Sequence, residues 1–315
     1  MKHRVAVVGA GISGLTCAVV FAESGFEAAI FADEIGDETN SGAAAAIWYP
    51  YDVGSSVEVI PWALASYRRF SELARQSDTG VSVSELRVFS RLGPITPPDW
   101  AQSFVTRPLA GSEIPSVFVS GFTIGVPLIE TGRYLKYLAA RLTNAGGSIS
   151  GGTRFAGLEE IESRFDLVIN CAGIGARELV PDPEMEPHRG QVAIVQKLDL
   201  PYAVVCDDSP LMYAIPRSND CVFGGTNEIS DDRTADPKTT ARIIRECERV
   251  LGRSAPPLIR ERVGLRPARS GGVRVAVGKL RDGRSVVHNY GHGGSGFTLS
   301  WGCAETVLEF ARRLL

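Results

Sequence analysis

The sequence predicts an α/β fold, in which a parallel-sheet domain built from both ends of the chain is interrupted by a mainly antiparallel α+β domain. Buried β-branched runs at 4–8 and 165–170 each lead into glycines, as parallel strands do before a tight turn. A third such run, at 286–289, leads into glycines and a terminal amphipathic helix. In the middle of the chain, short apolar runs are separated by Asp, Ser and Asn turns, a spacing that favours antiparallel pairing.

Length and composition exclude several classes of protein. The 315 residues correspond to about two domains, and 44% apolar with 22% charged residues is typical of a globular protein. A net charge of −3 offers no basic surface to nucleic acid, and no apolar run has the length of a membrane span. We therefore expect neither a nucleic-acid nor a membrane partner.

Cysteine and histidine usage indicates a reduced protein without a metal. The six cysteines are scattered and form no Cys-x-x-Cys pair, and the four histidines belong to no cluster with zinc-site spacing. A chain of this length with such cysteines is typical of the cytosol. The expectation is a cytoplasmic location and no metal site.

The first 33 residues have the order of a dinucleotide-binding unit. The strand at 4–8 runs into Gly9-Ala10-Gly11-Ile12-Ser13-Gly14, a helix follows, and a second strand at 28–32 ends with Ala32 and Asp33. The three glycines permit a tight turn, close approach of the backbone to a pyrophosphate, and close packing of helix on strand. Asp33 stands where a carboxylate accepts ribose hydroxyls. This motif predicts a dinucleotide without separating NAD from FAD.

The remaining elements follow from local patterns. Helices are expected at 61–75, from 131 to about 144, at 239–251, and after 296; strands are expected at 191–195, 203–206, 211–215, 221–224 and 273–277. The run 39–50 is rich in small residues and ends in aromatic ones. Such a run suits backbone packed against a flat ligand, or the start of an alanine-rich helix. A second glycine turn at 171–175 is either functional or an ordinary connection.

The glycine turn at 290–296 repeats the pattern of the first turn at the other end of the chain. Two helix N-termini of this kind can hold one large dinucleotide from two sides. The expected nucleotide domain is discontinuous, with residues 1–52, 127–185 and 262–315. The expected inserted domain holds 53–126 and 186–261.

Several motifs in this order resemble one family. They are the fingerprint at 5–15, Ala44-Ala45-Ala46-Ile47-Trp48 followed by Pro50, Asn170-Cys171-Ala172-Gly173, Arg189-Gly190-Gln191, Gly264-Leu265-Arg266-Pro267, His288-Asn289-Tyr290-Gly291-His292-Gly293-Gly294 continued by Ser295-Gly296-Phe297-Thr298, and Trp301-Gly302-Cys303-Ala304. The chain resembles the D-amino-acid oxidase family of flavoproteins along its whole length. The resemblance implies non-covalent FAD on a Rossmann-like FAD-binding domain, with the flavin at the interface to an inserted substrate domain.

The resemblance also implies a set of site residues. For FAD they are Gly9, Ala10, Gly11, Ile12, Ser13, Gly14, Ala32, Asp33, Ser41, Ala45, Ala46, Ile47, Gly173, Gly293, Gly294, Ser295, Gly296, Phe297 and Thr298. Arg266 matches the arginine that binds the substrate carboxylate, for which a planar guanidinium is suited. Tyr213 matches a tyrosine that helps to hold it, and the Gly294 carbonyl is expected to accept from the substrate amine. Ile47, Tyr49 and Ile215 are expected to form pocket wall.

Two departures from the family pattern have consequences. Ser209 stands where mammalian members carry a second tyrosine on a lid loop, so a more open pocket with faster product exit is expected. Tyr49 stands where glutamine is usual, which could narrow the side-chain pocket.

The implied reaction is oxidative deamination of a D-amino acid by hydride transfer to flavin N5, with hydrogen peroxide, ammonia and an α-keto acid as products. No side chain need act as a base, and His292 is assigned a structural role.

D-aspartate oxidase is one alternative and would need a further cation, for which Arg217 is the local candidate. A glycine or sarcosine oxidase is another, with Cys303 as a conceivable flavin tether or a buried helix residue. A flavoprotein without turnover and a nicotinamide-dependent dehydrogenase are more distant alternatives. A homodimer is weakly implied.

Overall fold

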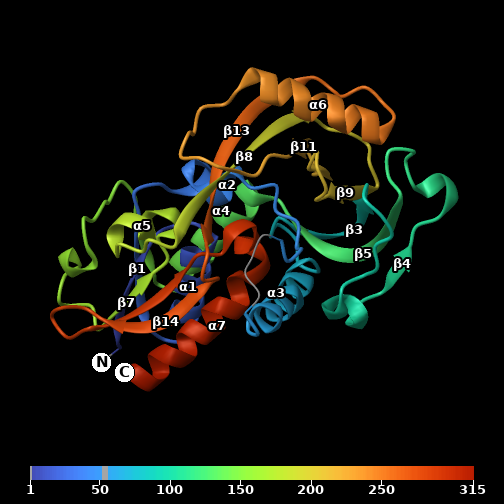
Figure 1. The fold of residues 1–315 in the computed structure, drawn as a ribbon. Helices are drawn as coiled ribbons and strands as arrows, with labels where there is room; N and C mark the ends of the chain where they lie inside the picture. The colour runs from blue at the N-terminus through green and yellow to red at the C-terminus, as the bar shows by residue number, and fades with distance from the viewer. Residues whose placement is uncertain (1, 52–55) are drawn as a thin grey trace. The chain divides into compact units, whose positions relative to one another are not determined.

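The computed structural model describes residues 2–51 and 56–315, which form two compact units. The first comprises Met1–Val81, Ile129–Pro187 and Arg266–Leu315, and the second comprises Ser82–Leu128 and His188–Leu265. The predicted α/β fold is confirmed (Figure 1). Among the described residues, no helix has both the length and the apolar character needed to cross a membrane.

The first unit contains a six-stranded sheet that is parallel except at one edge. In spatial order its strands are β14 (Arg274–Lys279), β15 (Ser285–Tyr290), β7 (Leu167–Asn170), β1 (Arg4–Val8), β2 (Glu27–Phe31) and β6 (Ser148–Ser150). Only the β14–β15 pair is antiparallel among these pairings. Strands β1 and β7 are apolar and almost wholly buried, as expected of strands covered on both faces.

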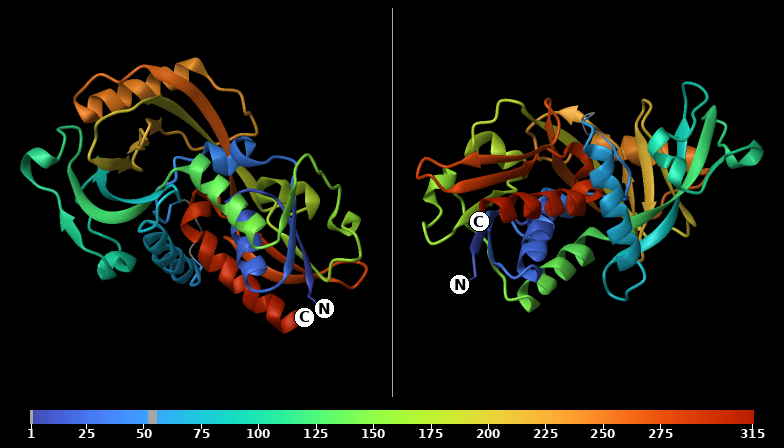
Figure 2. Two further views of the ribbon diagram at one scale, coloured as in Figure 1. Left: turned by 180° about the vertical axis from the view of Figure 1, so that it is seen from behind. Right: turned by 90° about the horizontal axis from the view of Figure 1, so that it is seen from below.

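Helices of the first unit pack against this sheet and each other. They are α1 (Ile12–Glu23), α2 (Asn40–Ala43), α3 (Val59–Leu73), α4 (Thr131–Asn144), α5 (Ala176–Leu179) and α7 (Gly296–Leu314). The first and last helices, α1 and α7, lie side by side in Figure 1 and in both views of Figure 2. Short 3-10 turns lie at Gly36–Glu38, Leu158–Glu160, Gly173–Gly175 and Gly293–Ser295. The N-termini of α1 and α7 thus follow the first and last glycine turns.

The second unit is built on a largely antiparallel sheet. Its strands are β3 (Val81–Ser90), β4 (Thr106–Pro108), β5 (Ser120–Ile129), β8 (Met185–Gln196), β9 (Tyr202–Cys206), β10 (Met212–Pro216), β11 (Asp220–Gly224), β12 (Glu228–Ile229) and β13 (Leu258–Arg269). The order is β12-β8-β11-β10-β9-β3-β5-β4, and β13 pairs with β8. The β3–β9 pair is parallel. Turns Asp99–Ser103 and Gly111–Glu113 complete the unit.

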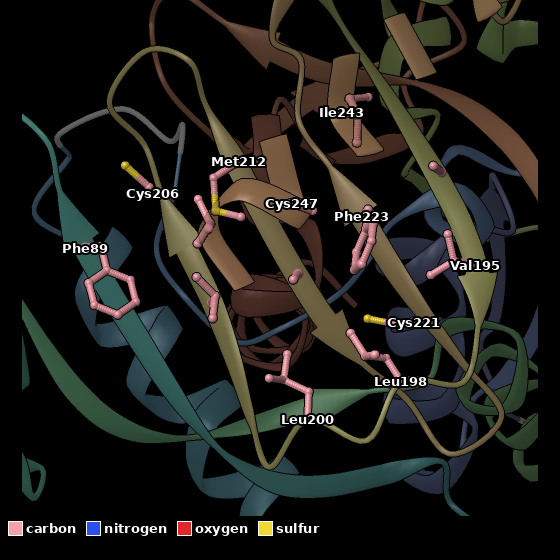
Figure 3. Packing of buried hydrophobic residues seen from close by; sticks show 14 of the residues in the cluster. Phe89, Val195, Leu198, Leu200, Cys206, Met212, Cys221, Phe223, Ile243 and Cys247 are labelled. Carbon is pink, nitrogen blue, oxygen red and sulfur yellow. The ribbon is translucent and has the colours of Figure 1, made fainter. Parts of the chain in front are cut away.

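One face of this sheet packs against helix α6 (Pro237–Leu251). Ile243 and Cys247 of the helix belong to the same buried cluster as Met212 and Phe223 of the strands (Figure 3). The helix begins where the Asp236 carboxylate accepts from two backbone N–H groups, and it ends at a left-handed Gly252. Because side chains alternate along a strand, Tyr213 and Ile215 of β10 face away from this core.

Several expectations about element bounds differ from the structure. Strands β3, β5 and β13 were not expected. The sequences of β3 and β13 mix charged and apolar residues without a clean alternation, and β5 contains two glycines and a proline. Helix α3 belongs to the first unit, whereas residues 53–126 were expected in the inserted domain. The reason is packing on α7, where Ser66 Oγ accepts from the backbone N–H groups of Trp301 and Gly302, both at 3.1 Å. The expected boundary at 52/53 lies outside the described residues.

Candidate functional site

Three glycine-containing turns lie at one edge of the parallel sheet. Strands β15, β7 and β1 are adjacent and parallel, with His288 opposite Asn170 and Asn170 opposite Val8. The turns at 9–14, 171–175 and 291–296 follow the carboxyl ends of these three strands. In α/β sheets, ligands bind at this edge, outside the carboxyl ends of the strands.

The first turn is compact because its glycines have no side chains. Gly9 has φ +104°, and a Cβ there would overlap the carbonyl oxygen of Cys171. A Cβ on Gly14 would overlap the carbonyl oxygen of Gly9. The first glycine therefore brings the turn against the end of β7, and the third brings α1 down onto the turn.

Ser41 contacts the N-terminus of α1. Its Oγ accepts a hydrogen bond from the backbone N–H of Ile12 at 2.9 Å, and it would lie 3.0 Å from a Cβ on Gly11. Ser41 is held there by the short helix α2, whose N-cap Thr39 accepts from the Gly42 backbone N–H. Ser41 thus lies beside the first glycine turn.

Asp33 follows β2 and is the acidic residue expected near a ribose. Gly9 N–H donates to the carbonyl of Phe31 at 2.8 Å, so the first turn and the end of β2 are neighbours. The Asp33 side chain is 60% exposed and lies 3.7 Å from Arg154 Nη1. Ala32 is buried, and its N–H donates to Ser150. The carboxylate therefore stands at the sheet edge, where solvent reaches it.

The last turn directly contacts the first. Ser13 Oγ lies 3.5 Å from His292 Nδ1, and a Cβ on Gly296 would lie 3.5 Å from Ile12 Cγ2. The Asn289 amide oxygen accepts from His292 Nε2 at 3.1 Å. Burial lowers the pKa of His292 to about 4, so its ring is neutral at pH 7. These contacts fit a structural His292 joining the two turns.

The start of α7 holds the segment after residue 48. Ser295 Oγ donates to the Tyr51 carbonyl at 2.6 Å and accepts from its N–H at 2.8 Å. Thr298 Oγ1 makes the same double contact with Tyr49, at 3.1 and 3.2 Å. Because both hydroxyls are engaged in this way, we propose that residues 293–298 bind a cofactor through their backbone. Phe297 is buried in the unit.

Tyr51 contacts two predicted site residues, Gly294 and Ser295, and was not itself predicted from the sequence. A Cβ on Gly294 would lie 2.6 Å from Tyr51 Cδ1, so the tyrosine ring lies directly on this glycine. Gly294 is the residue whose carbonyl is expected to accept from a substrate amine. The only sequence signal for Tyr51 was its place after the run of small residues, which does not reveal a contact about 240 residues away.

The segment 44–48 has an unusual backbone. Ala46 has φ +50°, a left-handed conformation uncommon for a residue with a side chain, and its carbonyl accepts from Ile129 N–H at 2.9 Å. Trp48 is fully buried and donates from Nε1 to the Ala63 carbonyl. Ala45 is buried and Ile47 half-buried. The segment is thus fixed at both ends, and such backbone strain is often found at functional sites.

Arg266 lies near the end of β13 and next to the second glycine turn. The ring of the following Pro267 lies 3.9 Å from a Cβ built on Gly173, which has φ +58°. The Arg266 side chain is half-buried. Arg266 belongs to the first unit, whereas Tyr213 belongs to the second.

The ring of Tyr213, on β10, lies over the neighbouring strand β11. Tyr213 is paired with Gly224 of β11, and a Cβ on Gly224 would overlap the tyrosine Cζ and Oη atoms. The ring therefore occupies the space that any larger residue at 224 would take. Two residues along, Ile215 is buried opposite Val222.

Comparison with known proteins identifies the family. The family model described as FAD dependent oxidoreductase (DAO) matches residues 4–310. The D-amino-acid oxidase of Rubrobacter xylanophilus is 39% identical, with 98% of this chain and 95% of the relative covered. That of Streptomyces coelicolor is 36% identical, with 98% and 96% covered.

The chain belongs to the DAO family of FAD-dependent oxidoreductases. A human relative, D-aspartate oxidase, is 31% identical over 98% of this chain and 94% of its own length. Among solved structures, glycine oxidase from Bacillus cereus has a TM-score of 0.82 at 17% identity, with 99% and 95% of the chains covered. At that identity the likeness shows the fold alone.

FAD is the cofactor of this DAO-family chain, and the residues present fit it. Gly9 and Gly14 pack so closely against the backbone of Cys171 and of Gly9 that no side chain fits, and the turn they form leads into the N-terminus of α1, which is suited to a pyrophosphate. Asp33 lies at the adjacent strand end. Within residues 2–51 and 56–315, no group of three His, Cys, Asp or Glu side chains could hold a metal ion.

Two other family motifs are internal to the protein. In Arg189-Gly190-Gln191, Arg189 donates to the carbonyls of Asp232 and Thr234 at 2.8 and 2.6 Å, which fixes the loop before α6. In Trp301-Gly302-Cys303-Ala304, the Cys303 thiol is fully buried, and burial raises its pKa well above the ordinary value. We propose that Cys303 is a core residue and that FAD binds without a covalent bond.

The candidate cation Arg217 is already engaged by a carboxylate. It donates from Nε and Nη2 to the two carboxylate oxygens of Asp220, at 2.6 and 2.9 Å. The two side chains are 11% and 22% exposed. This pair closes the β10–β11 hairpin, where Arg217 N–H also donates to the Asp220 carbonyl.

Proposed function

We propose that this chain is an FAD-dependent oxidase that converts D-amino acids to α-keto acids, with release of ammonia and hydrogen peroxide. The observation that carries the proposal is 39% identity to a D-amino-acid oxidase over 98% of the chain. The geometry of the three glycine turns supports it, since each turn presents backbone at the carboxyl edge of the sheet.

We propose that FAD binds along the three turns, with the pyrophosphate on the first turn and the ribose near Asp33. When bound, FAD accepts a hydride from the substrate α-carbon and passes the electrons to oxygen. The chain's residues supply position: Ser41 and His292 hold the turns, and Ala45 to Ile47 form a fixed backbone segment. A neutral His292, hydrogen-bonded on both ring nitrogens, has no spare proton acceptor for the reaction.

Arg266 is proposed to bind the substrate carboxylate, because a guanidinium fork donates two parallel hydrogen bonds and stays charged. Tyr213 is proposed to donate its phenol to the same carboxylate. The Gly294 carbonyl is proposed to accept from the amine, with Ile47, Tyr49 and Ile215 as wall. With carboxylate and amine both fixed, only one enantiomer directs its α-hydrogen at the flavin.

We propose that the preferred substrates have uncharged side chains. An acidic side chain requires a cation in the pocket, and the candidate Arg217 is paired through Nε and Nη2 with the two carboxylate oxygens of Asp220. A buried bidentate pair of this kind would have to be broken for Arg217 to serve a substrate. D-Aspartate oxidase, the activity named for the human relative, is therefore disfavoured.

A peroxide-coupled assay tests the function. Wild type and Arg266→Ala are each given both enantiomers of alanine, valine and aspartate, together with glycine and sarcosine. We expect D-alanine or D-valine to be fastest, and Arg266→Ala to keep FAD while losing about 3 kcal/mol or more in kcat/KM. Equal turnover of both enantiomers, or of D-alanine by the variant, would contradict the proposal. We further propose that the protein is cytoplasmic and forms a homodimer.

A further inference from the structure

One carboxylate oxygen joins three segments around the proposed carboxylate-binding strand. Asp182 follows α5, and its side chain is 3% exposed. Its Oδ2 accepts from Arg269 Nε at 3.0 Å, from Arg274 Nη1 at 3.2 Å and from Tyr290 Oη at 2.8 Å. Burial alone would raise the pKa of Asp182, but the hydrogen bonds from Arg269 and Tyr290 hold it at about 2. The carboxylate is therefore charged at neutral pH.

The first of these segments carries Arg266. Arg269 ends β13, three positions after Arg266. Because side chains alternate along a strand, the two arginines project from opposite faces of β13. Pro267 between them has no N–H to donate to a neighbouring strand. Anchoring Arg269 on one face therefore restrains the strand end that presents Arg266 on the other.

The second segment leads into the last glycine turn. Tyr290 is the last residue of β15 and is fully buried. The next residue, Gly291, has φ +84°, and a Cβ there would lie 2.9 Å from Arg269 Cβ. Arg269 thus passes directly under the start of the turn, while Asp182 holds both Arg269 and Tyr290.

The cluster is balanced in charge. Glu184 also binds Arg269, through Nη2, and Ser270 N–H donates to the Glu184 carbonyl at 3.0 Å. Two carboxylates, Asp182 and Glu184, thus face two guanidiniums, Arg269 and Arg274. With this balance, the cluster adds no net positive charge that would compete with Arg266 for a substrate carboxylate.

We propose that Asp182 is a positioning residue, which holds the end of β13 against β15 and thereby sets Arg266 in place to bind the substrate carboxylate. This inference rests on the role proposed for Arg266. It assigns to Asp182 an effect on substrate affinity, transmitted through Arg269 and Tyr290, with no contact between Asp182 and the substrate.

The test compares Asp182→Asn with Glu184→Gln. Both variants keep side-chain size and remove one carboxylate charge from Arg269, but only the first also removes the charge that binds Arg274 and Tyr290. Glu184 is 44% exposed. We expect Asp182→Asn to raise KM for D-alanine about 10-fold or more with kcat within about 3-fold, and Glu184→Gln to change KM by less than about 2-fold.

A second readout does not depend on turnover. Propionate, a carboxylate without an amine, is titrated into the FAD-loaded proteins and followed by the change in flavin absorption. A parallel rise of propionate Kd and of KM in Asp182→Asn alone supports the inference. The inference is overturned if KM and propionate Kd are the same in Asp182→Asn and Glu184→Gln. It is also overturned if Asp182→Asn has a lower Tm but wild-type KM and Kd. If Asp182→Asn does not fold, Tyr290→Phe is expected to raise both constants about 3-fold, and unchanged constants overturn the inference.

The two proposals fail differently. A wild type that binds propionate but oxidises no D-amino acid contradicts the proposed function, and the propionate titration then decides on Asp182 alone. A wild type that oxidises D-alanine, with Asp182→Asn equal to it in both constants, contradicts only the inference. A wild type that does neither overturns both.

Discussion

Ser13 and His292 are hydrogen-bonded although 279 positions separate them, with Ser13 Oγ 3.5 Å from His292 Nδ1. Each residue lies in a glycine turn at the start of a helix, α1 for Ser13 and α7 for His292. Asn289 accepts from His292 Nε2, which leaves Nδ1 to accept from Ser13. The bond therefore needs the neutral imidazole and ties the two ends of the chain together at the proposed FAD site.

This relationship predicts loss of stability in acid. Burial lowers the pKa of His292 from 6.5 to about 4, so the unfolded chain binds the proton more readily. The contribution of neutral His292 to the free energy of unfolding is therefore complete above pH 6.5 and is lost as the pH falls toward 4. Protonation of His292 should therefore lower the free energy of unfolding by about 2–3 kcal/mol at pH 4.5 relative to pH 7.

His288 has a pKa lowered in the same direction, also to about 4, by burial and by Arg274. Urea unfolding at pH 7 and 4.5 should therefore show a smaller acid loss in His292→Gln than in wild type, with part of the loss remaining. The same loss in both proteins would show that His292 is not the group responsible.

The first glycine turn should not accept a methyl group at its third glycine. In Gly14→Ala the Cβ would overlap the Gly9 carbonyl oxygen, which is backbone and cannot swing away. Overpacking of this kind costs about 1–3 kcal/mol, and we expect FAD affinity to fall by about 10- to 100-fold. Gly93→Ala is the control, because a Cβ there would have no neighbour within 4 Å. Fluorescence titration with FAD would contradict the assignment if both variants bound like wild type.

Gly224 should control the position of the Tyr213 ring. The Cβ of Gly224→Ala would occupy the space of the phenol, so we expect KM for D-alanine to rise about 10-fold with little change in FAD affinity. In a Tyr213→Ala background the same substitution has room and should add little. Additive effects of the two substitutions on KM would mean that Gly224 acts independently of Tyr213.

Removing the Asp220 charge should make acidic substrates more acceptable. Asp220→Asn keeps the shape of the residue but leaves Arg217 without its bidentate carboxylate partner. We expect the ratio of kcat/KM for D-aspartate to that for D-alanine to rise about 10-fold. Adding Arg217→Met should return the ratio to that of wild type. A ratio that does not move in Asp220→Asn would place Arg217 outside the reach of the substrate side chain.

Local patterns predicted most strands of the parallel sheet, although β6 was not expected. A buried strand followed by Gly9, Gly11 and Gly14 is a recognisable local pattern, although only Gly14 makes room for a nearby residue, Gly9, whereas Gly9 and Gly11 make room for the distant Cys171 and Ser41. The start of α4 at Thr131 and the left-handed Gly252 after α6 follow equally local signals. Strand β13 was missed, because charged residues such as Arg260 and Glu261 hide an alternation that pairing with β8 makes favourable.

Long-range contacts could not be predicted in this way. The ring of Tyr51 on Gly294, the pairing of Arg217 with Asp220, and the convergence on Asp182 depend on backbone geometry and side-chain direction, which spacing alone does not specify. The roles of Arg266 and Tyr213 came from the family resemblance. The structure adds contacts near both residues: Asp182 accepts from Arg269 at the end of β13, and the Tyr213 ring lies where a side chain on Gly224 would be.

The most direct test of the account is anaerobic reduction of the purified, FAD-loaded protein by one enantiomer of alanine. D-Alanine should bleach the oxidised flavin absorption, L-alanine should leave it unchanged, and admitted oxygen should restore it with release of peroxide. A protein that binds no FAD, or whose flavin responds equally to both enantiomers, would contradict the account.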